Sequence, residues 1–260
     1  MRIARFTTGD DPRYALVQQE GDRTYLAVLT GDPLYMPVTP TGERIELGDG
    51  VRLLAPVIPR SKVVAVGRNY ADHAKEMGND VPTSPLLFLK PNTSVIGPGD
   101  AIVRPPQSQR TDFEGELAAV IGRVAKNVPA SDALDYVFGY TIANDVTARD
   151  LQRSDGQWSR AKGFDTFCPL GPAIETEFSL DSGAEVVSRR NGEEKQRAPI
   201  SDMVHSVADI IAYASAAFTL LPGDVILTGT PAGVGPFEAG DVLEVEITGL
   251  GILRNIVRDA

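Results

Sequence analysis

The stretch Asp112-Phe-Glu-Gly-Glu-Leu-Ala-Ala-Val-Ile121 is the most informative part of the sequence, because an apolar strand follows directly on two closely spaced acids. Side chains alternate along a β-strand, so Glu114 and Glu116 share one face if the strand includes both. Gly115 between them leaves the opposite face bare, which allows close backbone packing. Two neighbouring carboxylates repel each other unless a cation lies between them. Taken alone, the pair is also compatible with a solvated strand end.

A third acid favours a metal site. Asp145 ends the apolar run that begins at Tyr140, where a buried carboxylate needs a partner. Three carboxylates with no cysteine or histidine nearby form a hard, all-oxygen donor set, which predicts Mg²⁺ or Mn²⁺ rather than Zn²⁺. Three protein ligands leave positions on an octahedral ion for water and substrate, as a catalytic metal requires.

The rest of the chain predicts an α+β fold that is mostly β. The strongest helical pattern covers 204–221, with shorter helices expected at 69–77 and at 131–137, the latter capped by Ser131. Strands outnumber helices and do not alternate with them, which argues against a doubly wound sheet. Strands are expected at 62–66, 85–89, 116–121, 140–145, 225–228, 242–247 and 252–257, with two weaker ones flanking Asn191-Gly192.

The first sixty residues differ in character from the remainder. Short apolar stretches alternate there with the turn pairs Gly9-Asp10, Gly21-Asp22 and Gly31-Asp32, a pattern typical of small antiparallel hairpins. Two prolines in 54–60 then suggest a boundary. We therefore predict a small N-terminal β domain over 1–60 and a catalytic domain over 61–260.

Composition excludes several classes of protein. The 260 residues are 42% hydrophobic and 23% charged, which is ordinary for a globular protein, and the net charge of −10 argues against a nucleic-acid partner. The sequence has neither an apolar run long enough to span a membrane nor the apolar core of a signal peptide. Its single cysteine, Cys168, suits a reducing compartment. We expect a cytoplasmic protein with no membrane association.

Five motifs occur in order over the last three quarters of the chain: Gly67-Arg-Asn-Tyr-Ala-Asp-His73, Asp112-Phe-Glu-Gly-Glu-Leu117, Asn144-Asp-Val-Thr-Ala-Arg-Asp-Leu-Gln152, Ala161-Lys-Gly-Phe-Asp-Thr-Phe-Cys-Pro-Leu-Gly-Pro172 and Thr228-Gly-Thr-Pro-Ala-Gly-Val-Gly235. Together they resemble the fumarylacetoacetate hydrolase family. The resemblance implies a β-roll catalytic core, a homodimer, a bound Mg²⁺ or Mn²⁺, and action on C–C bonds of 2-oxo or 1,3-dicarbonyl acids.

The resemblance also assigns roles to individual residues. Lys162 corresponds to the family's active-site lysine, which would stabilise an enolate, and a His73/Glu76 pair on one helical face would activate the attacking water. Three carboxylates, one divalent ion and Lys162 sum to zero charge, which leaves the site able to accept an anionic enolate. The assigned metal ligands are Glu114, Glu116 and Asp145, and the assigned substrate contacts are Arg68, Gln152, Gly229 and Thr230, the last two in a glycine-rich loop suited to binding a carboxylate.

Two departures from the family pattern bear on the substrate. The larger fumarylacetoacetate-cleaving members carry a fourth acidic ligand upstream of the histidine, and a tyrosine shortly after the glutamine, and both are missing here at 64–67 and 153–156. A smaller 2-oxo acid is therefore expected, cleaved as by an acylpyruvate hydrolase or oxaloacetate decarboxylase. The alternative is a 2-hydroxyhepta-2,4-diene-1,7-dioate isomerase or 5-carboxymethyl-2-oxo-hex-3-ene-1,7-dioate decarboxylase of aromatic catabolism. A catalytically silent scaffold would have lost some of these residues.

Overall fold

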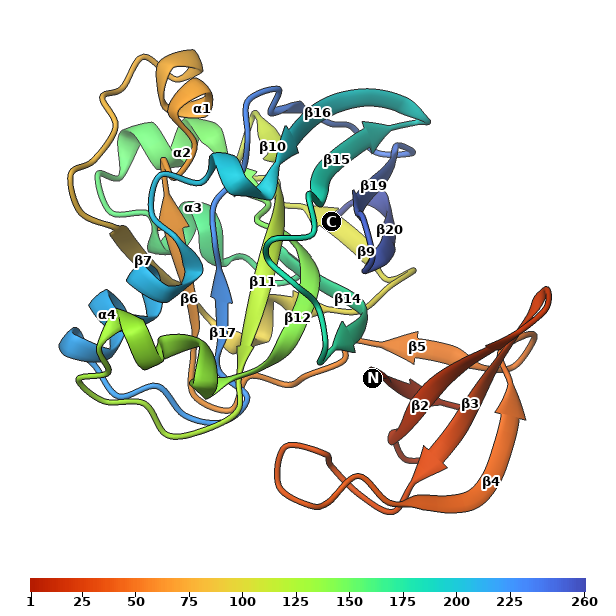
Figure 1. Ribbon diagram of the computed structural model, residues 1–260. Helices are drawn as coiled ribbons and strands as arrows, with labels where there is room; N and C mark the ends of the chain where they lie inside the picture. The colour runs from red at the N-terminus through yellow and green to blue at the C-terminus, as the bar shows by residue number, and fades with distance from the viewer.

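Three β-sheets form the framework of the protein, in a computed structural model that describes residues 1–260 (Figure 1). The largest has twelve strands and is antiparallel except where β17 pairs β6 and where β8 pairs β14. Its main path runs β4 (Pro40–Glu46), β3 (Arg23–Leu29), β2 (Arg13–Glu20), β1 (Arg2–Thr7), β14 (Cys168–Glu175), β12 (Val137–Asn144), β11 (Gly115–Ile121), β17 (Val225–Leu227), β6 (Val63–Gly67) and β7 (Leu86–Lys90), with β5 (Arg52–Leu54) on β1 and β8 (Val95–Ile96) on β14.

The central strand β11 is buried on both faces, which explains its unbroken apolar sequence. Leu117, Ala119 and Ile121 point into the main core, where the helix α4 (Val207–Ala217) packs. Ala118 and Val120 point into a second core on the other face of the sheet. The strand is thereby fixed in register and in direction, and so are the acids at its start.

Two smaller sheets complete the fold. One has three strands, β13 (Thr147–Ala148), β10 (Thr111–Phe113) and β18 (Gly235–Pro236). The other has five, β16 (Glu193–Pro199), β15 (Glu185–Arg190), β19 (Val242–Ile247), β20 (Gly251–Asp259) and β9 (Ala101–Arg104). The chain passes from the three-stranded sheet to the large one between β10 and β11, at Glu114. This mostly β, α+β architecture confirms the predicted fold class.

The N-terminal strands form hairpins, as the turn pairs predict, and enclose a small core around Phe6 and Leu26. Figure 1 shows them set apart from the helices. β1 also pairs with β14 through Arg2↔Glu175 and Ile3↔Ile174, so the large sheet continues into this part of the chain. The division into domains near residue 60 remains a prediction.

The helices differ more from their predicted bounds than the strands do. α4 is shorter than the predicted 204–221, because Ser206 caps its first turn with a reciprocal bond to Asp209, and because Phe218 adopts an extended backbone before Leu220 pairs with Ala125. The predicted helix at 131–137 is a 3₁₀-helix, η2 (Ala130–Tyr136), and Ser131 does not cap it. α1 (Ala71–Glu76) lies inside the predicted 69–77.

Two short helices were not predicted from the sequence, α2 (Arg149–Ser154) and α3 (Ser159–Gly163). The remaining short elements are the 3₁₀-helices η1 (Asn92–Ser94) and η3 (Ile200–Asp202). The strands predicted in 61–260 all occur, each within three residues of its expected ends, and the hairpin around Asn191-Gly192 occurs as well. Every helix is too short to be a membrane span.

Candidate active site

The three predicted metal ligands meet where strands end. Glu114 lies between β10 and β11, Glu116 is the second residue of β11, and Asp145 follows β12, whose Asn144 faces Gly115 across the sheet. Carboxylate oxygens of the three acids lie within 4.8 Å of one another, and each side chain is at most 5% exposed. The strand β11 includes Glu116 but not Glu114, so strand alternation does not by itself align the two; the passage of the chain from β10 to β11 at Glu114 nevertheless brings both glutamates together with Asp145.

Three buried cations surround this carboxylate cluster. Lys162 of α3 donates to Glu114 Oε2 at 2.6 Å and to Asp145 Oδ2 at 2.5 Å. Lys90, at the end of β7, donates to Asp145 Oδ1 at 2.5 Å. Arg149 of α2 donates to Glu114 Oε1 at 2.5 Å and to Asp112. Burial acts to lower the pKa of Lys162, but the two carboxylates outweigh it and raise that pKa, so the ammonium stays charged.

Glu116 is the one member of the cluster with no ion pair. Its Oε2 accepts a hydrogen bond from the Gly229 amide at 2.7 Å. Burial, together with the charges of Asp145 and Glu114, raises the pKa of Glu116 well above its ordinary value. For Glu114, by contrast, burial alone would raise the pKa, but Lys162 and Arg149 outweigh it and hold that pKa below its usual range. The cluster therefore carries a carboxylate whose charge the protein's own cations do not balance.

A divalent cation fits this donor set. All three side chains offer oxygen, the ligand that Mg²⁺ and Mn²⁺ prefer, and a cation beside Glu116 would neutralise the repulsion that raises its pKa. The charge count made from the sequence was incomplete, because it omitted Lys90, Arg149 and Asp112. With these three included, a site holding a divalent ion has one net positive charge, which favours an anionic substrate more strongly than the neutral site that was predicted.

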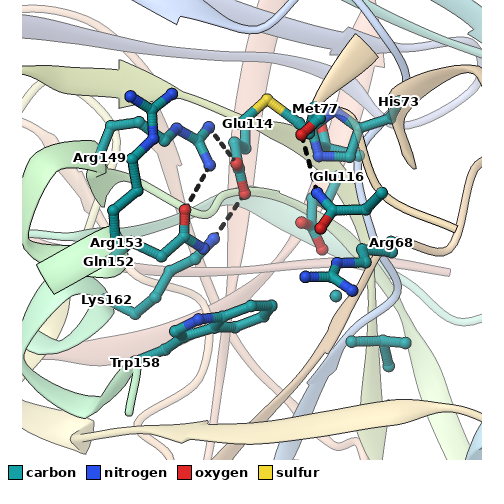
Figure 2. A pocket seen from close by; sticks show the side chains of 14 residues that line it. Arg68, His73, Met77, Glu114, Glu116, Arg149, Gln152, Arg153, Trp158 and Lys162 are labelled. Carbon is teal, nitrogen blue, oxygen red and sulfur yellow. Dashed lines mark hydrogen bonds and ion pairs between the residues drawn. The ribbon is translucent and has the colours of Figure 1, made fainter. Parts of the chain in front are cut away.

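The cluster opens into a cavity of about 270 Å³ lined by residues of several elements. Figure 2 shows Lys162, Arg149 and Gln152 on one side of Glu114, with His73 and Arg68 on the other and Trp158 below. The lining consists of Val66, Gly67, Arg68, His73, Met77, Asn79, Glu114, Glu116, Arg149, Gln152, Arg153, Trp158, Lys162 and Thr230.

His73 is a buried, neutral base in the wall of this cavity. Its side chain is 7% exposed, and burial, acting with the charges of Arg149 and Lys162, lowers its pKa despite the opposing charge of Glu114. Its Nδ1 lies 3.5 Å from Glu76 Oε2, which is a charge contact longer than a good hydrogen bond, and has no other partner. Glu76 instead accepts the Gly233 amide, at 3.1 Å from each of its oxygens.

Two arginines at the cavity have no acidic partner. Arg68 has a left-handed backbone, with φ of 59°, and its guanidinium carbon lies 6.0 Å from the centre of the Trp158 ring. Gly67 is required beside it, since a Cβ there would come within 2.6 Å of that ring. Arg153, on α2, is exposed at the cavity edge. Unpaired guanidinium groups at a cavity entrance suit a carboxylate of the substrate.

The other predicted substrate contacts are engaged within the protein. Gln152 accepts from Arg149 at 2.8 Å. Thr230 donates to the Gly115 carbonyl at 2.9 Å, and the Gly229 amide is used on Glu116. All but Gly229 still line the cavity, and their contact with substrate remains a prediction.

Sequence reasoning missed Lys90, Arg149, Trp158 and Gln196. The sequence does contain a sign of Lys90: it is a charged residue at the end of an apolar strand, as Asp145 is. Arg149 lies within a quoted motif but was given no role. Gln196 enters from β16, a hairpin strand with no feature in its sequence that points to the site.

Comparisons with known proteins identify the family of the chain. Residues 62–258 match the family model described as fumarylacetoacetate (FAA) hydrolase C-terminal, and residues 1–56 match the model described as Rv2993c-like, N-terminal. The chain is 50% identical to protein Rv2993c of Mycobacterium tuberculosis over 99% of this chain and 98% of that one. It is 44% identical to the human mitochondrial oxaloacetate tautomerase FAHD2A over 92% of this chain and 77% of that protein.

Two solved structures are informative. A 5-carboxymethyl-2-hydroxymuconate delta-isomerase from Mycobacterium smegmatis is 45% identical and superposes over 100% of both chains with a TM-score of 0.92. A fumarylpyruvate hydrolase from Pseudomonas aeruginosa, solved with Mn²⁺ and pyruvate, is 36% identical over 82% of this chain and 94% of that chain, with a TM-score of 0.74. The sequence motifs, the fold and these matches together establish that the chain belongs to the fumarylacetoacetate hydrolase family.

Proposed function

We propose that this protein is a divalent-metal-dependent enzyme that interconverts the keto and enol forms of a small 2-oxo dicarboxylic acid. The observation that carries the proposal is the placement of a neutral base, His73, and a charged Lys162 around the same carboxylate cluster in one cavity. Proton removal beside a carbonyl needs a base and a means of stabilising the enolate, and the site offers both.

Glu114, Glu116 and Asp145 would hold the cation. When bound, it would supply a Lewis acid that polarises the 2-oxo group and makes the neighbouring C–H more acidic. The Mn²⁺ in the structure of the P. aeruginosa fumarylpyruvate hydrolase supports a hard cation, Mg²⁺ or Mn²⁺, rather than a softer metal.

The protein's own residues would do the remaining work. His73 would accept the proton from C3 of the substrate, and solvent would protonate the enolate oxygen as the enol is released; the reverse direction takes the same two steps in the opposite order. Nε2 is available for this because Nδ1 faces Glu76. Lys162 places a positive charge beside the oxygen that becomes the enolate. Arg68 and Arg153 bind the carboxylate remote from the reacting carbon, which is why a dicarboxylic acid suits the cavity better than a monoacid.

The contact between His73 and Glu76 favours tautomerisation over hydrolysis. Activation of an attacking water calls for a histidine held and polarised by a carboxylate, yet Glu76 is hydrogen-bonded to Gly233, and its Oε2 lies 3.5 Å from His73 Nδ1, too far for a good hydrogen bond. The names of the human tautomerase and of the M. smegmatis isomerase support the same choice. Cleavage of a C–C bond, predicted from the sequence, is the second candidate, and the fumarylpyruvate hydrolase supports it.

Oxaloacetate with Mg²⁺ separates the candidates. A tautomerase accelerates the loss of enol absorbance in the ultraviolet and the exchange of C3 protons with deuterated solvent, but releases no pyruvate. A decarboxylase releases pyruvate, and a hydrolase cleaves an acylpyruvate instead. Chelator should abolish each activity. Lys162→Met should remove it too, whereas Lys126→Met, at an exposed lysine that donates to the Ala216 carbonyl, should not. Full activity in chelator would contradict the proposal.

The predicted homodimer is a further proposal, which light scattering of the purified protein would test.

A further inference from the structure

Gln196 is a buried polar residue with a position that the reaction does not explain. It belongs to β16, in the five-stranded sheet, and it is 1% exposed. Its side-chain oxygen accepts from the Gly115 amide at 3.0 Å. Its amide nitrogen donates to Thr230 Oγ1 at 2.8 Å and to the Pro231 carbonyl at 2.7 Å. One side chain thus joins two segments that lie 81 and 34–35 residues away in the sequence.

Both of those segments belong to the carboxylate cluster. Gly115 is the single residue between Glu114 and Glu116, and residues 229–231 carry the amide that binds Glu116. β17 ends at Leu227, opposite Ala118, so the start of β11 has no strand beside it on that edge. Gln196 and Thr230 bind the free amide and carbonyl of Gly115 in place of a strand.

The hairpin of β15 and β16 also determines which residue can stand between the glutamates. A Cβ on Gly115 would lie 2.2 Å from Ser188 Oγ of β15 and 2.9 Å from Val245. The same hairpin therefore constrains Gly115 in two ways: Ser188 leaves no room for a Cβ there, and Gln196 binds its amide.

We propose that Gln196 is a positioning residue for the metal site, which sets the separation of Glu114 and Glu116 and their distance from the loop at 229–231. Metal affinity depends on ligands held in place before the ion arrives, and hydrogen bonds that orient ligands contribute to it. The side chain must accept one hydrogen bond and donate two, and among side chains of this length only glutamine does both. The inference rests on the proposal that the three acids bind a divalent cation.

The test is the affinity for Mn²⁺ alone, measured by calorimetry or by the electron paramagnetic resonance signal of free Mn²⁺, without substrate. Gln196→Met keeps the length of the side chain and removes all three hydrogen bonds. We expect Mn²⁺ to bind at least ~10-fold more weakly, the scale known for residues that orient metal ligands.

Asn255→Leu provides the matched control. Asn255 is also a buried amide, 2% exposed, and it donates to the carbonyls of Gly97 and Asp100, which are not part of the cavity. Its replacement should lower the melting temperature in the same way as Gln196→Met but leave the affinity for Mn²⁺ at the parent value. A loss of affinity that merely follows loss of stability would appear in both variants.

A second variant keeps the test decisive if Gln196→Met does not fold. Thr230→Val preserves shape and removes one bond to Gln196 and one to Gly115, so it should weaken Mn²⁺ binding in the same direction. Parent affinity in the folded variants would overturn the role of Gln196 while leaving the metal site intact. A parent protein that binds no Mn²⁺ would overturn the metal site and this inference together.

Discussion

Glu116→Gln should stabilise the protein in chelator and yet remove its response to metal. Glu116 is buried, has no ion pair, and lies among carboxylates that raise its pKa. A glutamine has the same shape, keeps an oxygen to accept the Gly229 amide, and carries no charge. The substitution therefore relieves repulsion in the metal-free protein and removes a ligand from the metal-bound one.

The magnitude follows from the geometry. The carboxylate oxygens lie within 4.8 Å of one another, and two unit charges at that limit repel by about 3.5 kcal/mol with an effective dielectric constant of about 20. Lys162 offsets part of this, and a raised pKa allows Glu116 to escape the rest by binding a proton. We expect a gain of about 1–2 kcal/mol in the free energy of unfolding at pH 8, or roughly 2–8 °C in melting temperature for a chain of this length.

The gain should depend on pH in a definite direction. The pKa of Glu116 is higher in the folded than in the unfolded protein, so the folded state binds the extra proton, and stability falls as pH rises through the folded-state value. The advantage of Glu116→Gln is therefore largest at alkaline pH and shrinks as the pH approaches the ordinary range of a glutamate.

Thermal unfolding with chelator and with Mg²⁺ measures both effects. Mg²⁺ at 100 times its dissociation constant should stabilise the parent by about 2.7 kcal/mol and the variant not at all, so the order of stability reverses. Asp145→Asn is the matched control. It should also lose the response to Mg²⁺, but it should destabilise the protein in chelator by about 3–5 kcal/mol, because the buried Lys90 loses its carboxylate partner and keeps only neutral oxygens as acceptors.

Two results would refute this reasoning. If Glu116→Gln is less stable than the parent in chelator, the charge of Glu116 is already balanced and the account of the cluster is wrong. If Mg²⁺ stabilises the variant as much as the parent, Glu116 is not a ligand.

Further predictions concern single side chains. Lys162→Met should lower kcat by ~10²-fold or more, since it removes a charge partner of the enolate, and an effect confined to KM would limit the lysine to binding. His73→Ala should slow proton transfer or acylpyruvate hydrolysis by ~10²-fold, while decarboxylation of oxaloacetate, which needs no base, is affected much less. Arg153→Gln should raise KM for a dicarboxylic acid ~10-fold and leave that of a monoacid unchanged. Cys168, whose pKa burial raises to about 12, should react with a thiol reagent at pH 8 only after unfolding.

The elements that the sequence predicted well are those with a strong local pattern. β11 and β12 read as strands because apolar side chains fill cores on both of their faces, and the acids at their ends follow from where the apolar runs stop. The spacing of Glu114 and Glu116 suggested a shared strand face, and both carboxylates do reach one cluster although β11 begins only at Gly115. There was less reason in the sequence to place Asp145 beside the two glutamates. The register of β11 and β12, which puts Asn144 opposite Gly115, explains why Asp145 lies there.

Tertiary contacts determine the parts that were missed. α2 and α3 have six and five residues, too few to show a helical period, and they are held by the cores and ion pairs around Arg149 and Lys162. The end of α4 depends on pairing between Leu220 and Ala125, 95 residues apart. The cations that balance the acids come from β7, α2 and α3, and no spacing in the sequence predicts which of them reach Asp145 or Glu114.

The glycine-rich loop at 228–235 uses two of its backbone amides within the protein. Its glycines do expose amides to carboxylates, as the sequence suggested, but the carboxylates belong to the protein, Glu116 at Gly229 and Glu76 at Gly233. Both glycines have left-handed backbones, and a Cβ would come within 2.6 Å of Asn69 at the first and 2.0 Å of the Lys195 carbonyl at the second. An isolated anion-binding loop would need its glycines only for their backbone conformation. Here a side chain is also excluded by close contacts, with Asn69 just before α1 and with β16. The same loop therefore connects α1, which carries the base, to β11, which carries two of the ligands.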